Sequence, residues 1–190
     1  MPNNFAQSIM RKNKKQNRKI WIWRLEWEEN IAKQLLEKGY LTIGYYPFLK
    51  VANEICDKKH NFDECCAKIG YQSFRGQAEL EDFCRIMLKG DWIIILNFPK
   101  KGSFSIYELL EYQAKPISEI TNTVLKDLSV KKSEIGLVDL KGYPIDIGFF
   151  RKVNEIAKGL ENFRISNIVK ENRVNAEYNF PKSTTKKTTL

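Results

Sequence analysis

Three charged side chains have the residue types and the spacing of a metal-dependent nuclease core. Asp127 is followed twelve residues later by Asp139, and Lys141 comes two residues after that. In such cores two carboxylates hold Mg²⁺ and the lysine assists the attacking water. The core also needs supporting strands after the lysine, and here Gly142 and Pro144 end the strand. We therefore interpret Asp139 and Lys141 as alternating side chains of an exposed strand, and we expect no enzymatic activity.

A zinc site is the second chemistry that the residue types permit. Cys56, His60, Cys65 and Cys66 form a Cys-x3-His-x4-Cys-Cys pattern around the only histidine of the chain. Adjacent cysteines rarely bind one ion together, and the paired two-residue spacing of common zinc sites is absent. We expect no metal and no other cofactor. Together with Cys84, these cysteines are expected to be reduced thiols.

Composition is typical of a chain that buries a core. The sequence is 43% hydrophobic and 12% aromatic. No apolar run approaches the roughly 20 residues that cross a membrane, so we expect no membrane partner. The basic start is not followed by the long apolar segment of a secretory signal, which makes a cytoplasmic location the expectation.

Positive charge is concentrated at the two ends of the chain. The formal net charge is +9, yet residues 20–180 hold 23 basic and 23 acidic side chains. We expect a disordered basic arm over residues 1–19, one domain over residues 20–180 and a disordered tail over residues 181–190. The arm is expected either to contact phosphates or only to aid solubility. Its candidate contact residues are Arg11, Lys12, Lys14 and Lys15.

A helix followed by a buried strand is the clearest structural pattern. Residues 77–88 predict a helix with one apolar stripe, and Gly90 suits its left-handed end. We interpret Gly90 and Asp91 as a helix stop and turn, with no chemistry for Asp91. Residues 92–96 are apolar at every position, which predicts a central strand with both faces covered. The stripe consists of Leu80, Phe83, Cys84, Ile86 and Met87.

The remaining patterns mix strands and helices without regular alternation. Strands are predicted over 20–24, 40–46, 103–112, 134–140, 143–150 and 151–157, with 103–112 pairing the central strand. Helical segments are predicted over 27–38, 49–56, 62–69 and 163–171, while 120–128 is either a short helix or an irregular crossover. Glycines at intervals in the later strands favour a curved sheet. The fold class is therefore α+β, with a curved mixed sheet or pseudo-barrel and flanking helices.

Two motifs resemble those of EVE domains, which belong to the PUA-like superfamily with the YTH readers. Residues 74–78 with residues 87–91 are similar to the Arg-Asn-x-Gln-Ala to Met-x-x-Gly-Asp segment, with Gly76 in place of Asn. Residues 23–24 with 38–45 look like a Trp-Arg strand leading to Gly-x-x-x-Ile-Gly-Trp, with Tyr45 in place of the last Trp. Residues 147–153 are similar to a segment of N-terminal modules in restriction-type defence proteins. The resemblance implies a PUA-like (EVE/YTH-type) fold.

The resemblance also implies a reader of nucleic acid, with DNA favoured over RNA. Such domains often hold a flipped or modified base between aromatic rings, and a partner nuclease or motor chain would then act on the DNA. The candidate rings are Trp21, Trp23, Tyr45 and Trp92, and Arg75 and Lys89 would contact the backbone.

Simpler interpretations exist for each of these residues. Strand tryptophans and tyrosines often pack in a core or at its rim, and Arg75 has Glu79 and Asp82 as candidate ion-pair partners on its own helix. For the whole chain, the alternative to a reader is a protein-interaction or scaffold domain whose basic tails bind acidic partners. The small metal-dependent nuclease is the third hypothesis.

Overall fold

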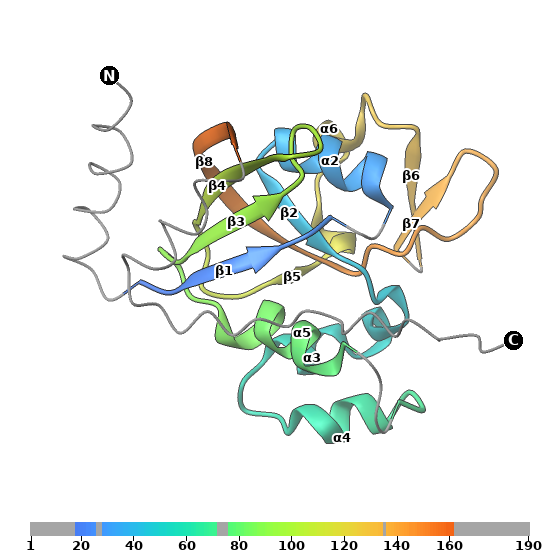
Figure 1. Ribbon diagram of the computed structural model, residues 1–190. Coiled ribbons are helices and arrows are strands. Elements are labelled where there is room, and N and C mark those ends of the chain that lie inside the picture. Colours follow the sequence, from blue (N-terminus) through green and yellow to red (C-terminus); the bar gives the residue numbers. More distant parts are fainter. Residues whose placement is uncertain (1–17, 26–27, 72–75, 135, 162–190) are drawn as a thin grey trace, which may run out of the picture.

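A curled mixed sheet forms the frame of the structure. The computed structural model describes residues 18–25, 28–71, 76–134 and 136–161. The sheet order is β1 (Ile20–Trp23), β3 (Trp92–Leu96), β4 (Ser103–Leu109), β8 (Phe149–Glu161) and β2 (Tyr40–Ile43), and β5 (Lys115–Pro116) also pairs with β8. β1 runs parallel to β3, while β4 pairs antiparallel with both β3 and β8 (Figure 1). The α+β class with a curved sheet is therefore confirmed, as is the pairing of β4 with the central strand.

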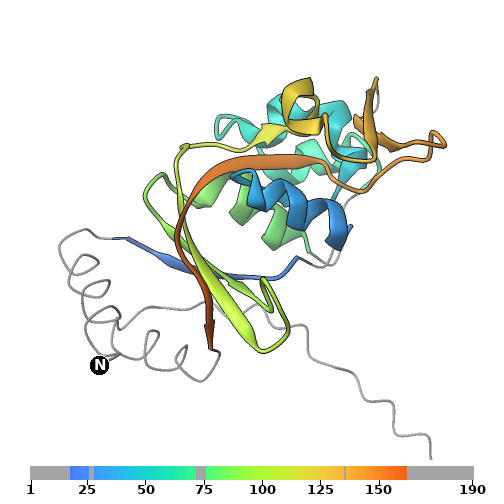
Figure 2. The same ribbon diagram turned by 90° about the horizontal axis from the view of Figure 1, so that it is seen from above.

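The long strand β8 gives the sheet its curvature. Its first residues pair with β2 and β5, and its later residues pair with β4. The register of β8 against β4 shifts on either side of Ile106, and such bulges bend a strand. Figure 2 shows the result, a half-barrel in which β8 sweeps around one side of the helices.

Helices fill the concave side of the sheet and close the main core. They are α2 (Glu29–Glu37), the 3-10 helix η1 (Tyr46–Val51), α3 (Ala52–Cys56), α4 (Phe62–Ala67), α5 (Gln77–Glu81) and the π-helical segment η2 (Asp82–Ile86). Side chains from α3, α4, α5 and η2 share one buried cluster with Ile93 and Ile95 of β3 and with Phe149 of β8. None of the helices that the structure describes is long and apolar enough to cross a membrane.

The predicted helix over 77–88 changes its winding halfway. Residues 77–81 are α-helical, but the Met87 amide donates to the Asp82 carbonyl at 2.9 Å, a π-type bond. The extra residue in this turn rotates the side chains that follow it about the helix axis. The prediction that Ile86 lies on the buried apolar stripe was therefore wrong. Ile86 is 39% exposed, and Arg85 is buried instead.

A smaller unit lies at the end of the molecule opposite β1 (Figure 1). It contains η3 (Ile117–Glu119), α6 (Asn122–Leu125), β6 (Val130–Ser133) and β7 (Gly136–Asp139). The strand predicted over 143–150 was wrong over residues 143–148, which are irregular apart from an isolated bridge of Pro144 to Val138, and β8 begins only at Phe149. The glycine that suggested a bend, Gly148, lies so close to the Gly44 and Tyr45 carbonyls that a Cβ atom would approach both to 2.7 Å. The predictions for residues 1–17 and 162–190 lie outside the described residues.

Candidate nucleic-acid interface

A buried carboxylate joins the starts of β1 and β3. Asp91 is only 4% exposed, and its Oδ1 accepts from the Lys19 amide at 3.1 Å. Its Oδ2 accepts from Trp21 Nε1 and from the Leu88 amide, both at 2.9 Å. Asp91 is therefore more than the turn residue that the sequence predicts, because its side chain fixes the orientation of the Trp21 ring.

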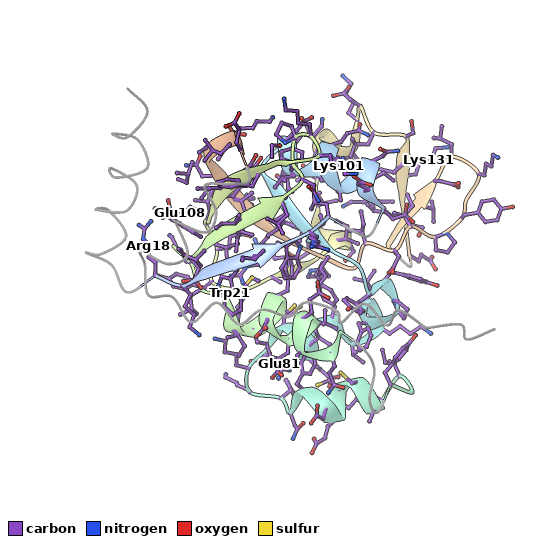
Figure 3. The ribbon with its side chains drawn as sticks, in the orientation of Figure 1. Arg18, Trp21, Glu81, Lys101, Glu108 and Lys131 are labelled. Atoms are coloured by element: carbon purple, nitrogen blue, oxygen red, sulfur yellow. The ribbon has the colours of Figure 1, made fainter. Side chains whose placement is uncertain are left out.

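Three cation–aromatic pairs involve the hydrogen-bond partners of Asp91 or its close neighbours in the sequence. The Lys19 ammonium lies 5.5 Å from the Trp21 ring centroid, and the Lys89 ammonium lies 5.7 Å from that of Tyr112. The Arg18 guanidinium lies 5.8 Å from the Trp92 ring centroid. We call Arg18, Lys19, Trp21, Lys89 and Tyr112 the amino-terminal edge; its labelled members Arg18 and Trp21 lie at one end of the molecule in Figure 3.

Arg18 also forms an ion pair across this edge. It contacts Glu108 of β4 at 3.2 Å, and Glu108 is the register partner of Trp92. Both side chains are only partly exposed, at 20% and 24%, so the pair fixes Arg18 beside the start of β3. The residues that precede Arg18 in the sequence are the basic arm, which therefore joins the fold at this edge.

Two of the predicted ring residues belong to the core. Trp23 is 7% exposed and stacks against Phe83 at a centroid distance of 5.4 Å. Trp92 is 3% exposed, and its Nε1 has no hydrogen-bond partner among the described residues. Both side chains match the simpler interpretation of core packing, whereas Trp21 is half-buried and retains accessible surface.

Tyr45 lies in a second, separate place, between η1 and α5. Its backbone is left-handed, with φ of 68°, and its hydroxyl donates to Glu79 Oε2 at 3.4 Å. The ring packs edge-on against Phe48. Burial, followed by the charge of Glu79, raises the pKa of Tyr45 well above its usual value. The hydroxyl therefore stays protonated and acts as a hydrogen-bond donor at neutral pH.

The two departures from the EVE-type motifs, Tyr45 and Gly76, lie in contact. A Cβ atom on Gly76 would lie only 1.9 Å from the Tyr45 hydroxyl oxygen. The tyrosine hydroxyl thus occupies the space that a side chain at position 76 would need. This contact is visible only in the structure, because the two residues are 31 positions apart in the sequence.

We expect Gly76→Ala to destabilise the fold more than Gly70→Ala. Both glycines have positive φ, +94° and +87°, so both substitutions carry the same backbone strain of about 1 kcal/mol. Only Gly76 faces a nearby side chain, whereas a Cβ atom on Gly70 meets nothing within 4 Å. Urea denaturation should give an excess loss of about 1–3 kcal/mol for Gly76→Ala. Adding Tyr45→Phe should recover part of that excess; equal losses for the two alanine variants would contradict the contact.

The nuclease candidates are each engaged in structural contacts. Asp127 pairs with Lys38 at 3.3 Å. Asp139 Oδ1 accepts from the amides of Lys141 and Tyr143, both at 2.8 Å, and so holds a turn. In the described part of the chain, no three His, Cys, Asp or Glu side chains are grouped to bind one metal ion.

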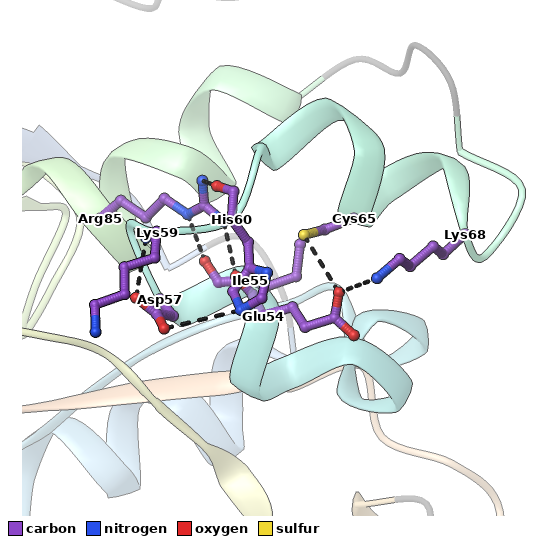
Figure 4. Close-up of polar contacts among 8 residues, drawn as sticks. All are labelled: Glu54, Ile55, Asp57, Lys59, His60, Cys65, Lys68 and Arg85. Carbon is purple, nitrogen blue, oxygen red and sulfur yellow. Dashed lines mark hydrogen bonds and ion pairs between the residues drawn. The ribbon is translucent and has the colours of Figure 1, made fainter.

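Two of the zinc candidates, His60 and Cys65, are likewise placed by other contacts, shown in Figure 4. The His60 carbonyl accepts from Arg85 at 2.8 Å, and the His60 ring lies 3.9 Å from Asp57. The Cys65 thiol donates to Glu54, which also pairs with Lys68. Burial raises the pKa of Cys66 to about 11, which keeps it a thiol. Cys56, Cys65, Cys66 and Cys84 are all free and buried.

Of the predicted contact residues, the structure brings Trp21 and Lys89 together and places Tyr45 apart. Arg75, Arg11, Lys12, Lys14 and Lys15 lie outside the described residues. Sequence reasoning missed Tyr112 and Asp91. The Gly-Asp step after the helix was the available signal for Asp91, while Tyr112 gave none, because its partner Lys89 is far away in sequence.

The amino-terminal edge can stack a planar ring on an aromatic face and neutralise phosphate charge with three cations. Its two carboxylates, Asp91 and Glu108, are engaged by hydrogen bonds and by the Arg18 ion pair. No protein-family model matches this chain, and neither a curated protein nor a solved structure matches it significantly.

Proposed function

We propose that this chain is a nucleic-acid-binding module with a PUA-like fold of the EVE type, and that its ligand is DNA. The observation that carries the proposal is the set of cation–aromatic pairs at the point where the basic arm joins the fold. Residues 20–180 are formally neutral, so net charge alone does not favour phosphate, and the clustered cations of this edge and of the arm supply the main affinity for it. Aromatic stacking adds about 1–3 kcal/mol per base without specifying sequence.

In this proposal the chain reads DNA for a nuclease or motor on another chain of a restriction-type system. The feature that it reads is a flipped or modified base. The resemblance of the motifs around Trp23, Tyr45 and residues 74–78 supports this part. Tyr45 is the ring that we place beside the base, because it is only half-buried and its hydroxyl is held by Glu79.

We expect Trp21→Ala and Tyr112→Ala each to weaken binding of a fluorescein-labelled DNA duplex by about 5- to 100-fold. Each substitution removes a ring and leaves its cation in place. Fluorescence anisotropy at low salt measures the affinity, and thermal unfolding checks that the fold persists. The matched control is Tyr40→Ala, a partly buried tyrosine of β2 that packs on Phe150, at the other end of the sheet order from β1.

The salt dependence tests the same proposal independently. Replacing Lys19 and Lys89 together by Gln should make the slope of log K against log salt shallower by about 1.8. A chain that begins at Arg18 should bind more weakly but still respond to Trp21→Ala. Absence of salt-dependent DNA affinity in the full chain would instead favour the scaffold alternative, in which the basic tails bind acidic proteins.

A further inference from the structure

A second basic and apolar surface lies at the opposite end of the molecule from the amino-terminal edge. In Figure 3, Lys131 marks this end, while Arg18 and Trp21 mark the other. The surface belongs to β6, β7 and the loop that follows β7. Exposed there are Leu140 at 63% and Tyr143 at 67%, two of the most exposed large apolar side chains among the described residues.

The loop is a built turn that presents these side chains. Asp139 Oδ1 accepts from the amides of Lys141 and Tyr143, and the Gly142 amide donates to the Asp139 carbonyl at 3.1 Å. Gly142 supplies the left-handed conformation that the turn requires, with φ of +92°. Because the turn is held by its own hydrogen bonds, little conformational entropy is lost when a ligand binds it.

The pairing register gathers cations beside the apolar side chains. Lys131 pairs with Val138, which in turn bridges to Pro144. Directly opposed residues project to the same face, so this face presents Lys131, Val138 and Pro144 together, next to the turn with Lys141. The one carboxylate in the turn, Asp139, keeps its charge and accepts from backbone amides. The turn surface is therefore apolar, with two lysines and one carboxylate at its margin.

We propose that this turn surface, Lys131 with residues 140–144, is a second contact for duplex DNA. The inference rests on the proposed function, which supplies an anionic ligand for a surface on which Lys131 and Lys141 outnumber the one carboxylate, Asp139. Lys131 and Lys141 contact backbone phosphates, while Leu140 and Tyr143 lie against the groove as apolar side chains do in minor-groove proteins.

The position of the surface sets a minimum length of DNA. A globule of this size is roughly 35–40 Å across, which corresponds to about eleven base pairs of duplex. A short duplex bound at the amino-terminal edge cannot reach the turn surface, whereas a long one can. The two contacts therefore have different dependence on duplex length.

The experiment measures anisotropy with labelled hairpin duplexes of about 8 and about 24 base pairs, using the full chain. The charge variant Lys131→Gln/Lys141→Gln should make the salt slope for the long duplex shallower by about 1.8. The apolar variant Leu140→Ser/Tyr143→Ser should weaken the long duplex by about 10-fold with the slope unchanged. Neither should alter binding of the short duplex. The matched control is Lys58→Gln/Lys59→Gln, two exposed lysines in the loop between α3 and α4.

Each failure has its own meaning. If both turn variants bind the long duplex like the parent and the control, the inference is wrong, and the surface would fit an acidic protein partner instead. If Trp21→Ala has no effect while the turn variants do, the amino-terminal edge is the wrong primary site. Loss of affinity for both duplex lengths in a turn variant would also overturn the length argument.

Discussion

Replacing Arg151 by Met is expected to lower the free energy of unfolding by about 3–5 kcal/mol. Arg151 lies in β8 with no solvent exposure, although its guanidinium is charged. Its Nη1 donates to the Phe83 and Met87 carbonyls at 3.0 and 2.9 Å, and its Nη2 donates to the Glu111 carbonyl at 2.6 Å. Methionine fills similar volume but leaves three carbonyls without donors.

The loss is large because these carbonyls end structural elements. Phe83 lies in η2 and Met87 directly follows it, and at such a helix end the carbonyl oxygens lack helical partners and carry partial negative charge. Burial lowers the pKa of Arg151 to about 10, so the guanidinium remains protonated at neutral pH and its charge is balanced by these dipoles. A depressed pKa in a base means that burial itself opposes folding, and the hydrogen bonds offset that cost.

Urea denaturation followed by tryptophan fluorescence measures the effect, with a midpoint shift of about 2 M. The control is Lys152→Met on the same strand, because Lys152 is exposed and should change stability by less than about 0.5 kcal/mol. If Arg151→Met were as stable as the parent, the guanidinium would not be holding these carbonyls. Lysine at the same position should rescue only partly, because one ammonium cannot reproduce the planar fork.

Sequence patterns were informative where burial alone decides structure. Residues 92–96 form a fully apolar strand with neighbours on both sides, as their composition predicts. Patterns failed where charged groups are buried by specific partners. Nothing in the sequence marks Arg85 and Arg151 as core residues, yet both are buried and bind backbone carbonyls from distant segments. No local pattern encodes such long-range pairing.

The candidate site shows the same division. An alternating strand with Trp21 and Trp23 predicts two faces but cannot say which face is covered. In the structure both rings lie on the face that packs against the main core, but Trp23 is buried against Phe83 whereas Trp21, nearer the start of β1, is only partly covered. Lys89 precedes β3 and Tyr112 follows β4, so the two side chains meet because these strands pair antiparallel. Neither residue type by itself predicts this contact.

Asp91→Asn is expected to cost about 2–4 kcal/mol of unfolding free energy although the side chains have the same shape. All three groups that face the carboxylate are donors, the Lys19 and Leu88 amides and Trp21 Nε1. An amide offers one acceptor oxygen and one donor group, so either orientation of asparagine places a donor against a donor. Because the same carboxylate orients Trp21, duplex DNA affinity should fall together with stability.

A double-mutant cycle separates the contribution of the indole. In a Trp21→Phe background one of the three facing donors is gone, so the cost of Asp91→Asn should shrink by about 0.5–1.5 kcal/mol. The matched control is Asp127→Asn, since Asp127 forms an exposed pair with Lys38 and should contribute less than about 1 kcal/mol. An Asp91→Asn variant as stable as this control would show that the carboxylate is not the link between β1 and β3. A cycle with no coupling would show that Trp21 is positioned by packing alone, and the DNA affinity of Asp91→Asn should then match the parent.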